Sequence, residues 1–546
     1  MSEKSLKYRD EVVKKLGEEK FDILIIGGGI TGAGIARDAA LRKLKVALIE
    51  KGDFGSGTSS GSSKLVHAGL RYLAQKEFRL VYEASREREK ILEMAPHLTR
   101  PLKFLVPLHS DTKTPKGKIR LAVWLYDIFA LFKNYTFHQL LNETRSRDLL
   151  PKPLRSENFQ GAALYGDGQM DDARLTLDVI LSAEEYGAYV LNYCIADEYQ
   201  VGSDDKIEMV VATDRITGRK IKITAKYIVF ACGHWTDKII HKFNPAAPLR
   251  LLPSKGIHII VKRFYDQDYA VVVPVKDGRI IFLVPFGDFL LIGTTDTVYK
   301  EDLDYVPVLE EEIEYLINAI NYLFPGVLKR ENILSAYSGI RPLILSPDAK
   351  SESDTSRKHE IFTIKANVLA IAGGKYTTYR SMAKEVVDKV SKELALTTKC
   401  ISDKMPLYGW SAITRSQWNS WKTIIKEEMI YRYNLPKDVA EHLTKYGKHY
   451  KLICEISETN PELKKRISES RPYILAEILY QIRNEKVITL NDVMLRRTQI
   501  QLTENQGLDC VENIAQFMGR YMNWNSKKIA DEIKIYLESL VLKPKT

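Results

Sequence analysis

The 546-residue sequence contains no apolar run long enough to cross a membrane. A spanning helix needs about 18 or more apolar residues, and the nearest stretch, LAVWLYDIFALF over 121–132, is shorter and contains Asp127. The first 20 residues mix both charges, which predicts a polar helix and argues against a cleaved secretory signal. Attachment to a membrane surface remains compatible with these observations.

Cysteine is scarce and widely spaced, at Cys194, Cys232, Cys400, Cys454 and Cys510. No C-x-x-C pair occurs, so neither a disulfide framework nor a metal site is expected, and a reducing cytoplasm is the default compartment. Internal repeats, low-complexity tracts and long Gly/Ser linkers are also missing from the sequence. Their absence predicts domains that pack against one another.

The composition is that of an ordinary globular protein, with 45% hydrophobic and 28% charged residues, which excludes collagen, coiled coil and extensive disorder. At roughly 150 residues per domain, the length predicts about three to four domains. The net charge of +11 suits anionic lipid, nucleic acid or a phosphorylated metabolite. No basic stripe with interleaved aromatic residues is present, so we expect no nucleic-acid partner.

Residues 21–50 predict a βαβ unit, with strands over 21–26 and 45–49 and a helix over about 30–42. The intervening turn fits G-x-G-x-x-G at Gly27, Gly29 and Gly32. The first glycine permits the tight turn, the second admits a pyrophosphate, and the third packs helix on strand. Glu50 ends the second strand, where a carboxylate binds ribose hydroxyls. This pattern predicts a dinucleotide site.

Two later segments, 226–237 and 367–380, repeat the pattern of a buried strand that ends at glycine. Their wide spacing favours one extended FAD across a discontinuous domain over a compact nicotinamide domain. No second G-x-G-x-x-G follows a strand, so a separate NAD(P)H site is not expected. Electrons must therefore leave the flavin by another route.

Eight segments together resemble FAD-dependent glycerol-3-phosphate dehydrogenase, in order from about residue 20 to 395. They are the turn described above, GTSSGSSKLVHAGLRYL (57–73), MAPHLTRP (94–101), DDARL (171–175), KGIHIIV (255–261), IGTTDTVYK (292–300), YSGIRPL (337–343) and GGKYTTYR (373–380). TLNDVMLRRTQI (489–500) resembles that family's C-terminal domain. The chain has Ala68, His234 and Tyr376 where the family commonly has Gly, Pro and Leu, which puts local flavin packing in question.

The resemblance implies oxidation of sn-glycerol 3-phosphate to dihydroxyacetone phosphate, with non-covalent FAD taking a hydride and membrane quinone receiving the electrons. It also implies a cytoplasmic protein bound peripherally to the inner face of the cell membrane; a homodimer is left open. One alternative is a glycerol-3-phosphate oxidase that reduces oxygen to hydrogen peroxide. The absence of an insertion before Arg357 that family oxidases often carry disfavours it. A second alternative is an FAD-binding scaffold without turnover.

Substrate binding is implied by the resemblance for residues suited to a phosphate dianion or a hydroxyl group, namely Arg71, Tyr72, His258, Arg341, Arg357 and Lys375. Arginine offers a fork of donors to phosphate oxygens, and lysine offers a point charge. Loss of hydride from carbon 2 also requires a base near neutral pKa. The expected base is His67, with His258 as the alternative.

The cofactor contacts implied by the resemblance come from the glycine turn, the 58–65 segment and the ends of later strands. They are Gly27, Gly29, Gly32, Glu50, Thr58, Ser59, Ser63, Leu65, Ala196, Ala231, Gly233, Gly339, Gly374, Lys375 and Thr377. Serine and threonine at such positions are otherwise ordinary turn residues.

The expected fold class is α/β, with a discontinuous Rossmann-like FAD-binding domain, an antiparallel-sheet substrate domain and an all-helical C-terminal domain. The expected boundaries are 1–20 for a polar helix, 20–100, 165–245 and 335–395 for the FAD domain, 101–164 and 246–334 for the substrate domain, and 400–546 for the helical domain. Strand-like segments between 258 and 295 supply the antiparallel sheet.

One amphipathic segment, 116–136, is the expected membrane contact. Basic residues (Lys116, Lys118, Arg120 and Lys133) flank an apolar stretch with four aromatic residues (Trp124, Tyr126, Phe129 and Phe132). A buried helix beside the substrate domain is an equal alternative because Asp127 interrupts the apolar run. The basic C-terminal domain is a second candidate for the membrane contact.

Overall fold

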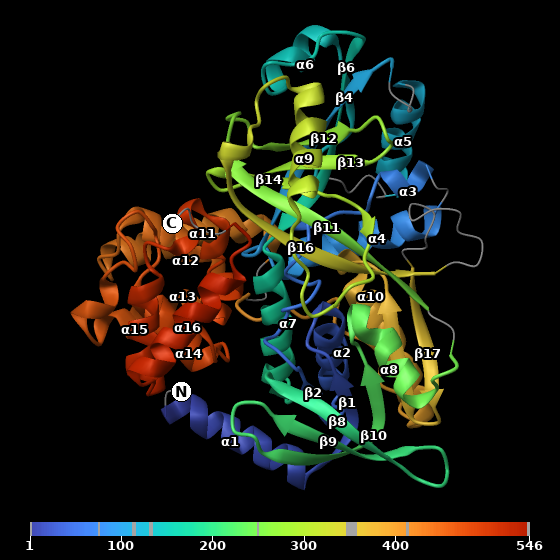
Figure 1. Ribbon diagram of the computed structural model, residues 1–546, viewed down its shortest axis with the longest axis vertical. Helices are drawn as coiled ribbons and strands as arrows, with labels where there is room; N and C mark the ends of the chain where they lie inside the picture. Colours follow the sequence, from blue (N-terminus) through green and yellow to red (C-terminus); the bar gives the residue numbers. More distant parts are fainter. Residues whose placement is uncertain are drawn as a thin grey trace.

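The computed structural model describes residues 3–74, 77–111, 116–129, 135–247, 250–345, 358–410 and 414–542. Within these ranges the chain forms two sheets that lie one above the other, and a helical C-terminal part lies beside them (Figure 1). The expected fold class is confirmed.

The first sheet has the order β17-β18-β10-β1-β2-β7, and an antiparallel pair, β8 and β9, extends from β10. The strands from β18 to β7 are parallel, whereas β17 is antiparallel to β18. Their bounds are β1 (Lys20–Ile26), β2 (Val46–Ile49), β7 (Tyr189–Leu191), β8 (Cys194–Val201), β9 (Ile207–Asp214), β10 (Lys220–Phe230), β17 (His359–Lys365) and β18 (Val368–Gly373).

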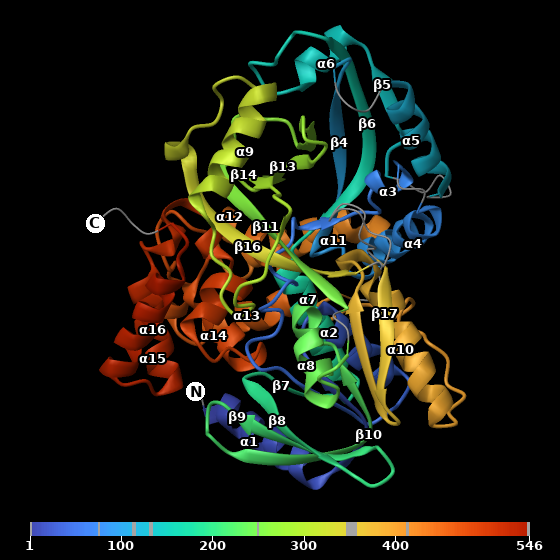
Figure 2. The ribbon, with the colours of Figure 1, turned by 45° about the vertical axis from the view of Figure 1, so that its right-hand side comes forward.

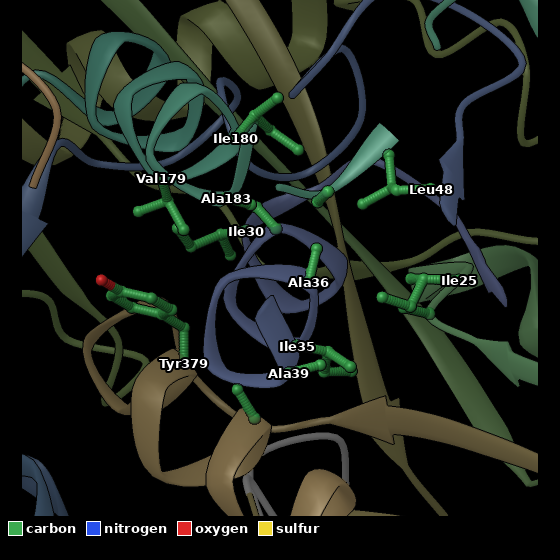
Figure 3. Packing of buried hydrophobic residues seen from close by; sticks show 14 of the residues in the cluster. Ile25, Ile30, Ile35, Ala36, Ala39, Leu48, Val179, Ile180, Ala183 and Tyr379 are labelled. Atoms are coloured by element: carbon green, nitrogen blue, oxygen red, sulfur yellow. The ribbon is translucent and has the colours of Figure 1, made fainter. Parts of the chain in front are cut away.

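Helices cover both faces of this sheet, because alternate strand residues point to opposite sides. Ile23 and Ile25 face the core made by α2 (Ile30–Leu41), α7 (Asp172–Glu185) and α10 (Tyr379–Glu393), where α2 is central (Figure 3). Leu24 and Ile26 face the opposite core, to which α1 (Glu3–Glu18) contributes. The predicted βαβ unit therefore forms, with a short turn between β1 and α2.

The second sheet has the order β15-β11-β14-β13-β12-β4-β6-β3, with β16 beside β11 and β5 beside β6. It is antiparallel throughout its described pairs except between β4 and β12. Its strands are β3 (Leu65–Val66), β4 (Thr99–His109), β5 (Gln139–Leu141), β6 (Phe159–Met170), β11 (Leu251–Lys262), β12 (Tyr269–Pro274), β13 (Ile280–Phe286), β14 (Phe289–Gly293), β15 (Thr297–Val298) and β16 (Ile333–Ile344).

Helices also flank the second sheet (Figure 2). On one face, α9 (Glu310–Leu323) packs Ile313, Leu316 and Ile320 against Ile257 and Ile259 of β11. The other face carries α3 (Arg71–Ala74), α4 (Phe78–Met94) and α5 (Lys116–Phe129). Of two shorter helices, α6 (Glu143–Leu149) lies at the upper end of the molecule, and α8 (Thr236–Phe243) packs beside β18 of the first sheet (Figure 1).

The C-terminal region is helical and has its own apolar core. Its α-helices are α11 (Trp418–Tyr431), α12 (Lys437–Leu443), α13 (Tyr450–Glu458), α14 (Leu475–Asn484), α15 (Val511–Met522) and α16 (Ser526–Ser539). Buried ion pairs join it to the first sheet: Arg496 Nε and Arg497 Nη1 lie 2.6 and 2.8 Å from Asp53 Oδ2. The arginines of the TLNDVMLRRTQI segment thus fasten the loop that follows Glu50.

No helix within the described ranges is long and apolar enough to cross a bilayer.

Candidate functional site

A cavity of about 1290 Å³ lies between the two sheets and is lined by both. The residues predicted to bind substrate or cofactor that line it are Gly27, Gly29, Glu50, Thr58, Ser59, Ser63, Leu65, His67, Tyr72, Ala196, Ala231, Gly233, His258, Gly339, Arg341, Gly374, Lys375 and Thr377. Gly32 lies behind the turn and does not line the cavity. Arg71 lies in α3, but its side chain and the whole of Arg357 are outside the described residues.

The glycine turn is closed so tightly that two of its positions admit no side chain. Gly27 has φ +115°, and a Cβ there would lie 2.5 Å from the Ala231 carbonyl oxygen. A Cβ on Gly32 would lie 1.9 Å from the Gly27 carbonyl oxygen. The start of α2 consequently presses against β1 and β10, as a dinucleotide turn requires. The Ile30 N–H donates to Ser59 Oγ at 2.9 Å, which fixes the 58–65 segment beside this turn.

Glu50 lies at the edge of the cavity with both carboxylate oxygens held by backbone. Oε2 accepts from the Gly28 N–H at 2.6 Å, and Oε1 accepts from the Gly52 N–H at 2.8 Å. Burial raises the pKa of Glu50, and these two hydrogen bonds oppose that change. The carboxylate is therefore oriented before any ligand arrives and has lone pairs left for ribose hydroxyls.

The opposite wall of the cavity is one face of β11 and β16. His258 is the cross-strand partner of Tyr337, Gly256 of Gly339, and Ser254 of Arg341. Because side chains alternate along a strand, all six residues share this face. A Cβ on Gly256 would lie 2.4 Å from Nη2 of Arg341, so that glycine makes room for the guanidinium.

Arg341 is held at this wall by residues of the segment after β14. Nη2 donates to Thr294 Oγ1 at 2.8 Å and to the Thr295 carbonyl at 3.3 Å, and Nη1 lies 3.3 Å from Asp296 Oδ1. Its side chain is 22% exposed. A fixed, partly exposed guanidinium at a cavity wall suits an anionic ligand.

His258 is buried, with 2% of its surface exposed, and it stacks on Tyr337 at 4.9 Å between ring centroids. Its Nε2 lies 2.8 Å from Ser63 Oγ, whereas Nδ1 has no hydrogen-bond partner among the described residues. Burial first, and then the charges of Arg341 and Lys64, hold the pKa of His258 well below its usual range. The imidazole is consequently neutral at physiological pH.

His67 directly follows β3 at the edge of the second sheet and lines the cavity, and its backbone is bracketed by Thr377, which follows β18 of the first sheet. The Thr377 hydroxyl accepts from the His67 N–H at 3.2 Å and donates to its carbonyl at 3.1 Å. Nearby, Lys375 Nζ lies 3.4 Å from the Tyr72 ring centroid and 3.4 Å from the Ala68 carbonyl. The turn between β18 and α10 thus brings a cation beside the predicted site residue Tyr72.

Two positions that depart from the family pattern are accommodated by polar contacts. His234 packs on Trp235 and lies 3.3 Å from Thr58 Oγ1, and burial lowers its pKa to about 4. Tyr376 donates its hydroxyl to the Asp172 carbonyl at 2.7 Å. Both residues line the cavity, so they alter its surface and leave its polar wall in place.

Sequence reasoning missed Tyr337, Thr294 and Asp296 as parts of the site. They lie in segments that carried the resemblance, but no role was assigned to them. A signal was available for Tyr337, because it is four residues before Arg341 on a strand and shares its face. No comparable signal existed for Thr294 or Asp296, whose contact with Arg341 depends on strand pairing across more than 40 residues.

The amphipathic segment forms α5 over Lys116–Phe129, and Phe132 and Lys133 lie outside the described residues. Leu121 and Trp124 are 56% and 51% exposed, while Asp127 is buried and paired with His138 at 2.7 Å. The other face of the helix turns inward, and its residues Ile119, Ala122 and Leu125 line the cavity. The helix is therefore buried on one side and exposes apolar side chains on the other.

Comparisons with known proteins agree with this geometry. A family model described as FAD dependent oxidoreductase matches residues 22–379, and one described as the C-terminal domain of alpha-glycerophosphate oxidase matches residues 400–529. The aerobic glycerol-3-phosphate dehydrogenase of Staphylococcus haemolyticus is 34% identical, covering 97% of this chain and 96% of its own length. The probable mitochondrial glycerol-3-phosphate dehydrogenase of Dictyostelium discoideum is also 34% identical, covering 94% and 83%.

Among solved structures, the glycerol-3-phosphate dehydrogenase of Bacillus halodurans complexed with FAD matches with a TM-score of 0.81 and 29% identity. The match covers 100% of this chain and 99% of that chain. The L-alpha-glycerophosphate oxidase of Mycoplasma pneumoniae matches with a TM-score of 0.51 and 17% identity, which is a likeness of fold alone.

Proposed function

Because the chain belongs to the family of FAD-dependent glycerol-3-phosphate dehydrogenases, we propose that it oxidises sn-glycerol 3-phosphate to dihydroxyacetone phosphate. The main support for this proposal is a single cavity that is lined both by the dinucleotide turn at Gly27 and by His258 and Arg341. FAD, which we propose is bound without a covalent link, would supply the hydride acceptor. Every other requirement of the reaction falls to side chains of the cavity.

The phosphate group of the substrate is assigned to Arg341 and Lys375. A phosphate dianion leaves water only where cations and donors replace its hydration. The guanidinium of Arg341 is anchored by Thr294, Thr295 and Asp296, so binding requires little further ordering of its side chain. Arg71 and Arg357 complete the proposed set of cations.

The proton of the substrate hydroxyl on carbon 2 is assigned to His67, with Tyr72 and His258 as hydroxyl ligands. A general base works best when its pKa lies near the ambient pH. The lowered pKa of His258 makes it a weak proton acceptor but keeps it neutral as a hydrogen-bond partner. The lowered pKa disfavours His258 as the base, which leaves it the role of an orienting ligand.

Anaerobic mixing of the purified holoenzyme with glycerol 3-phosphate tests the proposed oxidation. We expect loss of the oxidised-flavin absorption and formation of one dihydroxyacetone phosphate per FAD. Persistent flavin absorption would overturn the proposal and favour a scaffold that holds FAD without turnover. Glycerol, which lacks the phosphate, is the matched control and should leave the absorption unchanged at the same concentration.

The proposed electron acceptor is a membrane quinone. The support is an apolar part of the cavity next to α5, where Ile119, Ala122 and Leu125 face inward beside the exposed Leu121 and Trp124. An acceptor dissolved in lipid would meet the enzyme at such a surface. Reoxidation of the reduced enzyme by a short-chain quinone and by oxygen can be compared directly. Faster reoxidation by oxygen, with stoichiometric hydrogen peroxide, would favour the oxidase.

The proposed location is the inner face of the cell membrane, with α5 as the contact. Lys116, Lys118 and Arg120 are exposed at its start and would face anionic headgroups, while Leu121 and Trp124 would enter the interface. Tyr135 and Phe137 are also exposed, and the next residue, His138, is bonded to Asp127 of α5.

A further inference from the structure

A buried ion pair that the proposed mechanism does not use lies beside the predicted flavin segment. Lys64 Nζ is 2.6 Å from Asp172 Oδ1, and the two side chains are 1% and 0% exposed. Asp172 is the first residue of α7 and belongs to the DDARL segment, to which no role has been assigned. Replacing a buried ion pair by apolar residues is often neutral for stability, so stability alone does not explain this one.

The other oxygen of the Asp172 carboxylate holds the neighbouring residue of the same turn. Oδ2 accepts from Ser62 Oγ at 2.7 Å and from the Ser62 N–H at 3.3 Å. From the opposite side, the Tyr337 hydroxyl donates to the Ser62 carbonyl at 2.6 Å. Lys64 adopts φ +55°, a left-handed conformation that costs a lysine free energy and persists where surrounding contacts fix it. The turn Ser62–Ser63–Lys64 is therefore clamped by α7 and β16.

Ser63, the middle residue of this turn, contacts the wall of the cavity that β11 and β16 form. Ser63 Oγ lies 2.8 Å from His258 Nε2 and is the hydrogen-bond partner that the described residues give to that ring. The ring also stacks on Tyr337, which itself donates to Ser62. Displacement of the turn would therefore change both the hydrogen bond and the orientation of His258.

We propose that Asp172 is a positioning residue for the oxidation: through Lys64 and Ser62 it fixes Ser63 against His258, and so sets the orientation of the imidazole in the wall of the cavity. The expected effect on the rate of flavin reduction by glycerol 3-phosphate rests on the proposed function. The structural content of the inference, that Asp172 controls the Ser63–His258 hydrogen bond, is independent of the substrate.

The kinetic test is a double-mutant cycle on anaerobic flavin reduction by glycerol 3-phosphate. Asp172→Asn leaves Lys64 without its counter-charge, and Ser63→Ala removes the hydrogen bond directly. Each should slow flavin reduction by about 10- to 100-fold, the scale of a small misplacement near a reacting atom. Because both act through one contact, the double variant should be no more than about 3-fold slower than the slower single variant. The inference would be overturned if the rate losses of the two single variants multiply in the double variant, or if the rate is unchanged in Asp172→Asn.

A rescue separates positioning from general damage. In Asp172→Asn combined with Lys64→Met, the asparagine oxygen still accepts from Ser62, and no buried cation lacks a partner. The rate should return to within about 3-fold of the wild type, and failure to recover would count against the clamp. If Asp172→Asn does not fold, Ser62→Ala replaces it in the cycle, because that change leaves the ion pair intact.

An activity-independent measurement keeps this test apart from the proposed function. The 15N signals of His258 in histidine-labelled holoenzyme can be identified by their absence in His258→Asn. Asp172→Asn and Ser63→Ala should shift these signals in the same direction, and an unmoved signal in Asp172→Asn would refute the clamp. If wild-type flavin is not reduced by glycerol 3-phosphate, the proposed function fails, and the NMR result still decides the structural inference.

Discussion

The two walls of the cavity are built in different ways. The first sheet contributes mainly backbone: a glycine turn with no space for side chains, and a carboxylate at Glu50 that backbone N–H groups hold in place. The second sheet contributes side chains, His258 and Arg341, which neighbouring antiparallel strands bring to one face. The glycine turn and Glu50 lie close together in sequence, whereas His258 and Arg341 are more than 80 positions apart.

Because of this difference, we expect the two walls to tolerate different amino-acid substitutions. A wall made of close backbone contacts fails when any atom is added, because the displaced group is itself main chain. A wall made of side chains fails when a functional group is removed, and the strands beneath it persist. Substitutions on the two sides should therefore damage different properties, cofactor retention on the first and turnover on the second.

The largest effect is expected from Gly32→Val in the glycine turn, on the retention of FAD. Its Cβ would lie 1.9 Å from the Gly27 carbonyl, so the turn cannot keep its shape. The purified protein should contain almost no FAD, as measured by the ratio of absorbance at 450 and 280 nm. Gly117→Val is the matched control, because a Cβ there meets nothing within 4 Å, and it should retain FAD. Full FAD content in Gly32→Val would contradict the assignment of this turn.

His67→Asn should have the next largest effect, on the rate of flavin reduction. Loss of a general base typically costs about 100- to 10,000-fold. The variant should keep FAD and bind glycerol 3-phosphate with little change, as followed by the flavin spectrum during a titration. His258→Asn should mainly weaken substrate orientation and cause the smaller loss in rate. The reverse order of the two losses would exchange their roles.

Arg341→Ala should reduce kcat/KM for glycerol 3-phosphate while FAD stays bound. Removing one partner of a buried charge pair costs about 2–5 kcal/mol, which corresponds to about 30- to 4,000-fold. Arg341→Lys, which keeps the charge but loses the fork, should fall between this variant and the wild type. Arg330→Ala, at an exposed pair with Glu310, is the control and should behave as the wild type. Unaltered kinetics in Arg341→Ala would refute the phosphate assignment.

Trp124→Glu should have the smallest of the four effects and should act on location. Burial of one large apolar side chain contributes about 1.5–3 kcal/mol, so binding to anionic vesicles should fall by about 10- to 100-fold in a sedimentation assay. Tyr431→Glu is the control, because Tyr431 is 83% exposed on α11 of the C-terminal region. If Tyr431→Glu weakens binding and Trp124→Glu does not, the membrane contact lies in the C-terminal domain.

The sequence by itself determined the parts whose physics is local. The βαβ unit at residues 21–50, the glycine turn, the carboxylate at Glu50, and the helical C-terminal region follow from periodicity, turn sterics and strand ends, and the structure has each of them. FAD was favoured by three strand-to-glycine segments and the family by the resemblance of eight ordered segments, and the comparisons confirm both. The roles of His67, His258 and the predicted cations stay predictions.

Tertiary structure alone decided which side chains meet. The sequence offered no means of pairing Asp296 with Arg341, Ser63 with His258, or Lys64 with Asp172, because each contact depends on how two distant segments lie across a sheet. It also decided how α5 divides between cavity and solvent, which the interrupted apolar run at Asp127 left open. The contact between Gly32 and Gly27 acts between near neighbours in the chain, whereas strand register and buried charge are settled only when the whole core forms.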